Sequence, residues 1–113
     1  MPTIYHLAQK ENWEAAEQSG LYAGGLTDKR DGFIHFSSDA EIETSAALYC
    51  QGMTDLMLVS VESEKLGPIL KWEISRDGVS FPHLYGSLNT TLVNWVKPLP
   101  LGRDGLHEFP PLD

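Results

Sequence analysis

The chain has 113 residues, of which 42% are hydrophobic and 21% charged, and its formal net charge is −8. This length fits one compact domain with one hydrophobic core, and the composition excludes wholesale disorder. The negative charge disfavours long nucleic acids and anionic lipid as partners, because the overall field repels phosphates. We therefore expect a single domain over residues 1–113.

The first half of the chain alternates strand and helix patterns. Residues 3–8 (TIYHLA) have the length and composition of a strand, and residues 10–20 (KENWEAAEQSG) change to a helical period that ends at a glycine. Residues 21–32, rich in glycine and charge, are expected to form a loop. Residues 33–38 (FIHFSS) then form a strand, and residues 40–52 a second amphipathic helix.

The second half consists of short strand-like runs at residues 55–63, 69–75, 81–86 and 91–99. Turn-forming stretches separate them, which indicates an antiparallel meander or a pair of packed sheets. The proline-containing tail, residues 101–113, is expected to lie on the domain as an extended arm. The order of elements predicts an α+β fold with two helices in the N-terminal half.

Several classes of site are disfavoured by what the sequence lacks. No apolar run is long enough to span a membrane, and the first ten residues have neither the basic lead nor the apolar core of a secretory signal, so a cytoplasmic protein is expected. Cys50 is the only cysteine, which excludes an internal disulfide. No histidine pair has a metal-binding spacing, so we expect no metal site.

Three of the four histidines fall in strand-like segments beside aromatic residues: His6, His35 and His83. The alternation of a strand places His35 and Ser37 on the face opposite Ile34 and Phe36. If Ile34 and Phe36 face the core, His35 and Ser37 face outward or into a cleft. The hypothesis of one ligand site requires the three histidines to converge on one cavity. The alternative is a half-exposed strand histidine satisfied by one neighbour.

The stretches DGFIHFSS (31–38), LKWEIS (70–75) and FPHLYG (81–86), in this order, resemble the domain of unknown function 952 family, a group of small bacterial proteins. The resemblance extends over nearly the whole chain. That family is grouped with the ADP-ribosyltransferase-like fold. The resemblance therefore implies a split, strongly bent antiparallel sheet with a cleft that holds NAD in active relatives.

The resemblance also implies roles for particular residues. His6 is similar to a first-strand histidine that orients the ribose and nicotinamide of NAD, His35 stands where a tyrosine stacks on nicotinamide, and Ser37 occupies a position that steadies the pocket. A catalytic glutamate is normally found on a later strand, but FPHLYG has His83 and Tyr85 in that neighbourhood, and Glu73 is the nearby acid that could substitute. The expected catalytic residues are His6, His35 and Glu73, and the expected cofactor-binding residues are His6, His35, Ser37, His83 and Tyr85.

Two functions of different classes remain open. One is transfer of ADP-ribose from NAD, and the other is a non-catalytic module that binds a nucleotide or related small molecule, which the missing glutamate favours. Relatives that transfer ADP-ribose to an RNA 2′-phosphate carry a similar strand and grip the phosphate with several arginines. That third possibility requires two of Arg30, Arg76 and Arg103 to reach the mouth of the cleft beside His35.

Overall fold

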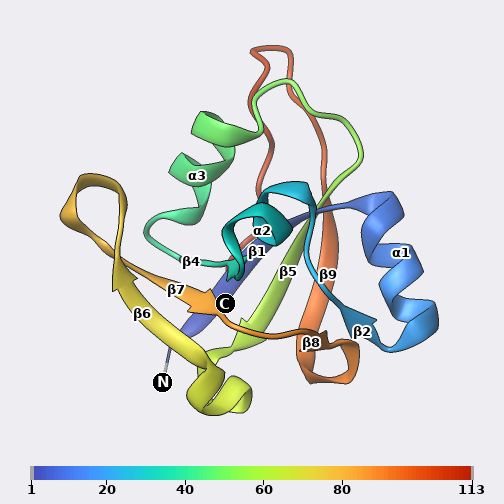
Figure 1. Cartoon of the computed structure of the whole chain (residues 1–113). Coiled ribbons are helices and arrows are strands. Elements are labelled where there is room, and N and C mark those ends of the chain that lie inside the picture. Colours follow the sequence, from blue (N-terminus) through green and yellow to red (C-terminus); the bar gives the residue numbers. More distant parts are fainter. Residues whose placement is uncertain (1, 113) are drawn as a thin grey trace.

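The computed structural model describes residues 2–112, and within them antiparallel strands predominate over helices (Figure 1). The strands are β1 (Thr3–Gln9), β2 (Leu21–Tyr22), β3 (Ile34–His35), β4 (Ser37–Ser38), β5 (Leu56–Glu62), β6 (Leu70–Ile74), β7 (Ser80–Leu84), β8 (Leu88–Asn89) and β9 (Val93–Leu99). The α-helices are α1 (Lys10–Ser19), α2 (Leu26–Asp31) and α3 (Ile42–Tyr49), and short 3₁₀ segments occupy Ser63–Ile69, Arg76–Gly78 and Thr90–Leu92. The predicted α+β class is confirmed.

The strands form three antiparallel sheets with the orders β4-β1-β5-β9, β3-β7-β6 and β2-β8. β1 pairs with β5 along its whole length but with β4 only at Ile4 and Tyr5. From His6 onward this edge of β1 has no strand partner in the described part of the chain. The sheet is therefore open at that edge.

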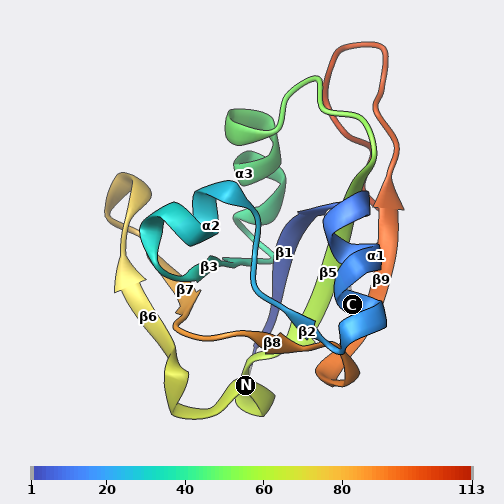
Figure 2. The same cartoon turned by 45° about the vertical axis from the view of Figure 1, so that its right-hand side comes forward.

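The four-stranded sheet packs on both faces because its inner strands alternate two sets of apolar side chains. Ile4 and Ala8 of β1 join one buried cluster with Trp13 of α1, whereas Tyr5 joins a second cluster with Ile42 of α3. Figures 1 and 2 show α1 beside β2 and β5, and α2 and α3 next to each other beside β1. The two clusters hold α1 and α3 against opposite faces of one sheet.

The segment predicted as one strand, residues 33–38, is divided between two sheets. β3 pairs with β7, β4 pairs with β1, and Phe36 between them is buried and donates its backbone N–H to the carbonyl of Pro82. Strand alternation alone does not reveal such a division, because both halves have the same apolar pattern. The prediction of one continuous strand is wrong here.

The expectation of two helices in the N-terminal half is also wrong, because residues 21–32 are not a plain loop. They contain β2 and α2, a six-residue helix between Gly25 and Gly32. The side chain of Asp28, three residues after Gly25, accepts a hydrogen bond from the Gly25 backbone N–H at 2.7 Å. Gly32 ends the helix in the left-handed conformation, with φ of 87°. Tertiary contacts of Asp28 stabilise a helix too short to form alone.

A pair of glycine substitutions tests how closely the segment before α2 packs on Asp28. Gly24 and Gly32 both have positive φ, so Gly24→Ala and Gly32→Ala each introduce left-handed strain of roughly 1–2 kcal/mol. A Cβ at Gly24 lies 2.6 Å from the Asp28 Cβ, whereas one at Gly32 meets nothing within 4 Å. We expect Gly24→Ala to lower the free energy of unfolding by about 1–3 kcal/mol more than Gly32→Ala. Urea denaturation measures the difference, and equal losses would show that Asp28 is not held in place.

Candidate functional site

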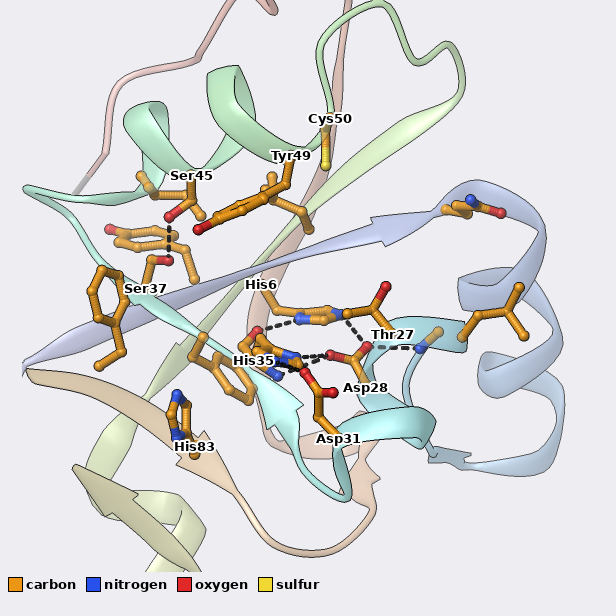
Figure 3. Close-up of a pocket in the computed structure, with 18 of the residues that line it drawn as sticks. His6, Thr27, Asp28, Asp31, His35, Ser37, Ser45, Tyr49, Cys50 and His83 are labelled. Atoms are coloured by element: carbon orange, nitrogen blue, oxygen red, sulfur yellow. Dashed lines mark hydrogen bonds and ion pairs between the residues drawn. The ribbon is translucent and has the colours of Figure 1, made fainter. Parts of the chain in front are cut away.

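A cavity of about 710 Å³ lies between α2 and α3, with β1 and β4 along its floor (Figure 3). This volume is within the range of about 300–1,000 Å³ found for small-molecule sites. The edge of β1 that β4 leaves unpaired borders it, since His6, Leu7 and Gln9 are among the lining residues. His6, His35 and His83, which are far apart in the sequence, all line it, as does Ser37.

Asp28 is the central charged group on the α2 side of this cavity, and its exposed fraction is 7%. One carboxylate oxygen accepts from the His35 backbone N–H at 3.0 Å and from the His35 ring at 2.6 Å. The other oxygen accepts from the Gly25 N–H and lies 3.8 Å from His6 Nε2. Although burial opposes its ionisation, the hydrogen bond from the His35 side chain helps to hold the pKa of Asp28 below its ordinary value.

His35 donates hydrogen bonds from both ring nitrogens. Its Nδ1 donates to Asp28, and its Nε2 donates to the Asp31 carboxylate at 3.0 Å. Because ionised carboxylates only accept, both nitrogens carry a proton and the ring is an imidazolium. The hydrogen bond to Asp28 raises the pKa of His35, partial burial opposes this, and the charge of Asp31 adds to it. His35 is therefore a fixed cation rather than a free base.

His6 is buried and joins three segments of the chain. Its Nδ1 donates to the His35 carbonyl at 2.5 Å, across the gap between β1 and β3. Since Nδ1 carries the proton, Nε2 accepts from the Tyr22 hydroxyl at 2.7 Å. Burial lowers the pKa of His6 and raises that of Tyr22, so both groups are neutral. His6 bridges the open edge of the sheet.

His83 lies directly opposite His35 in the β3–β7 ladder, with the two ring centroids 5.8 Å apart. Phe33 stacks on the His83 ring at 4.0 Å, and Nδ1 of His83 donates to the Glu73 carboxylate at 2.8 Å. Among the described residues, no partner binds its Nε2. In the neutral ring this nitrogen is an acceptor, available to an N–H or O–H group of a ligand.

Glu73 and Tyr85 do not line the cavity, unlike the other residues expected at the site. One carboxylate oxygen of Glu73 accepts from both the Tyr85 hydroxyl, at 2.7 Å, and His83. These two hydrogen bonds, from Tyr85 above all, lower the pKa of Glu73. Glu73 and Tyr85 thus orient His83 from behind, and the catalytic role expected of Glu73 stays a prediction.

The sequence interpretation missed Asp28, which lay in the segment read as a loop. A signal was present, since an acid three residues after a glycine, with a second glycine four residues further on, is typical of the start and end of a short helix.

We call the residues His6, Asp28, Asp31, His35 and His83 the histidine wall of the cavity.

Two of the three arginines, Arg30 and Arg76, line the cavity, whereas Arg103 does not. Arg30 is largely exposed and pairs with Asp31 at 3.0 Å, and Arg76 pairs with Glu41 at 2.9 Å.

No group of three or more potential metal ligands is found within residues 2–112. None of the helices in that range is long and apolar enough to cross a membrane.

Neutralising Asp28 should change the titration of His35 more than neutralising Asp31 does, because the bond to Asp28 is shorter and more buried. We expect the pKa of His35, followed by the NMR shift of its ring protons, to lie above 6.5 in the wild type and to fall in Asp28→Asn by more than in Asp31→Asn. A larger fall in Asp31→Asn would contradict this account.

The same pair makes the free energy of unfolding depend on pH. A pKa raised by folding adds stability that is complete below the unfolded value of 6.5 and is lost as pH rises through the folded-state pKa. In Asp28→Asn the free energy of unfolding should depend less on pH. At pH 6, where the pair is charged in the wild type, the substitution should lower the free energy of unfolding by about 1–3 kcal/mol.

A model of a family described as proteins of unknown function, DUF952, matches residues 7–96. The crystal structure of protein CC0527 from Caulobacter crescentus is 40% identical in sequence, with 94% of this chain and 93% of that chain covered and a TM-score of 0.91. A solution NMR structure of CC0527 is also 40% identical, with 94% and 91% covered and a TM-score of 0.83. No functionally curated protein matches. On this family match and this similarity, the chain belongs to the DUF952 family.

Proposed function

We propose that this chain binds NAD or an ADP-ribose-like nucleotide in the cavity between α2 and α3, as a cleft of ADP-ribosyltransferase type. The observation that carries the proposal is the meeting of His6, His35 and His83 with a buried carboxylate at one cavity. The division of residues 33–38 between two sheets is consistent with the split, bent sheet of that fold.

The histidine wall matches the polar parts of a nucleoside. The open nitrogen of His83 can accept from a ribose hydroxyl or from the amide N–H of nicotinamide. The Asp28 oxygen beside His6 can accept one more hydrogen bond, from a ligand hydroxyl. Tyr5, Tyr22, Phe36 and Phe81 also border the cavity, but as buried packing, since their exposed fractions of 1–6% leave little open ring face.

As an enzyme, the protein would transfer ADP-ribose. The bond between the ribose C1′ and the nicotinamide nitrogen breaks, and nicotinamide leaves as a neutral molecule with the bonding electron pair. The C1′ then bonds to an acceptor oxygen, which loses its proton to solvent or a base. Asp28 is the buried carboxylate that lines the cavity and could stabilise positive charge developing on the ribose, against the opposing charge of the His35 imidazolium beside it.

The second candidate function is a nucleotide-binding module without catalysis. It is favoured by the position of Glu73, which lies outside the cavity lining and hydrogen-bonds His83 and Tyr85. Release of nicotinamide during incubation with NAD separates the two functions. Saturable NAD binding without release would favour the binding module over the transferase.

Calorimetric titration with NAD, ADP-ribose and nicotinamide tests the binding proposal. We expect saturable binding by the wild type and at least about tenfold weaker binding by His83→Ala, which loses a ligand acceptor and about 1.4 kcal/mol or more. His107→Ala serves as the control, because His107 lies in the C-terminal segment, donates to the Met53 carbonyl and does not itself line the cavity. Absence of heat from all three ligands with folded wild-type protein would overturn the proposal.

The same titration with His35→Ala tests whether the His35 ring, which Asp28 holds, contacts the ligand. Loss of affinity in a variant that remains folded places His35 at the ligand, even though loss of the pair with Asp28 lowers the melting temperature. A large loss of thermal stability with unchanged affinity would assign it a structural role instead.

A further inference from the structure

The side of the cavity opposite the histidine wall carries a second polar set. Ser45 and Tyr49 lie on α3, Ser37 lies on β4, and Arg76 lies in the turn between β6 and β7. Figure 3 shows Ser37, Ser45 and Tyr49 together on the α3 side, away from His35 and Asp28. We call Ser37, Ser45, Tyr49 and Arg76 the arginine wall.

The guanidinium of Arg76 is held in place on several sides, and its side chain is only 14% exposed. Its Nη2 donates to the Glu41 carboxylate at 2.9 Å and to the Ser45 hydroxyl at 3.3 Å. The group lies 4.9 Å from the centre of the Phe81 ring and 5.6 Å from that of Tyr49. An arginine fixed in this way loses little further freedom when it binds a ligand.

The arginine wall has hydrogen-bond donors left over. A guanidinium has five N–H groups. Among the described residues, Glu41 and Ser45 accept two of them, and even with Tyr49 counted as a third acceptor, two remain. The Ser37 and Ser45 hydroxyls, both buried, share one hydrogen bond of 2.9 Å, so one of their two hydrogens is also left for another acceptor.

The two walls therefore differ in what they offer a ligand. On the histidine wall, His6 and His35 already donate to protein oxygens, and an acceptor nitrogen on His83 and carboxylate oxygens remain. On the arginine wall, donors remain. A phosphate group only accepts when ionised, and an arginine binds it through charge-assisted hydrogen bonds. The free donors of the arginine wall therefore match the acceptor oxygens of a phosphate group.

We propose that the arginine wall is an anion subsite that takes a phosphate group of the bound ligand. This inference rests on the proposed function, because it places the pyrophosphate of the nucleotide whose nucleoside part occupies the histidine wall. Glu41 is part of the subsite, since its charge neutralises Arg76 in the absence of ligand. The phosphate competes with Glu41 for the guanidinium, so removing the Glu41 charge strengthens binding of the anion.

Titration with inorganic pyrophosphate at one fixed low salt concentration tests the subsite without any nucleoside. We expect Arg76→Gln to weaken pyrophosphate binding by roughly tenfold or more, because charge-assisted hydrogen bonds to the anion are lost. Glu41→Gln should strengthen binding several-fold. Arg103→Gln, which removes an equal charge outside the cavity, should leave affinity unchanged and so excludes an effect of net charge.

The outcomes separate this inference from the proposed function. Pyrophosphate binding that is absent in the wild type, or equal in wild type and Arg76→Gln, overturns the subsite even if NAD binds. Opposite effects of Arg76→Gln and Glu41→Gln support the subsite, also in a protein that binds no NAD. Thermal unfolding of each variant verifies that it is folded, and Arg76→Lys, which keeps the charge but not the paired donors, provides a second variant if Arg76→Gln does not fold.

Discussion

The buried carboxylate of Asp28 is the interaction on which the histidine side of the cavity depends. It accepts hydrogen bonds from the backbone of Gly25 and from both the backbone and the ring of His35, so it ties α2 to β3. His35 in turn offers its carbonyl to His6 on β1. A buried charge needs hydrogen-bonding partners, and here that requirement fixes the relative positions of three segments.

The open edge of β1 is the second constraint. β4 pairs with only Ile4 and Tyr5, because the chain crosses between two sheets at Phe36. A free strand edge inside a protein leaves polar groups that need partners. The ring of His6 reaches from this edge to the His35 carbonyl on β3, and the cavity lies along the same edge. The site and the interruption of the sheet thus have one structural cause.

Several of the histidines and arginines at the cavity are already paired with carboxylates. Asp28 and Asp31 hold His35, Glu73 holds His83, and Glu41 holds Arg76. These pairs keep the side chains oriented before a ligand arrives, which reduces the entropy lost on binding. They also explain how a chain with a net charge of −8 can present cations in a cavity, since its carboxylates lie beside them.

The sequence by itself determined the elements with a strong period: β1, α1, α3 and the longer strands β5, β6, β7 and β9, because alternation and helical spacing are local properties. It also singled out His6, His35, Ser37 and His83, all of which line the cavity. Only the tertiary structure decided that residues 33–38 divide between two sheets, that α2 forms and that Asp28 and Arg76 face the same cavity. These features depend on hydrogen bonds and packing between residues far apart in the chain, such as Arg76 with Glu41 and Ser45, which no local pattern encodes.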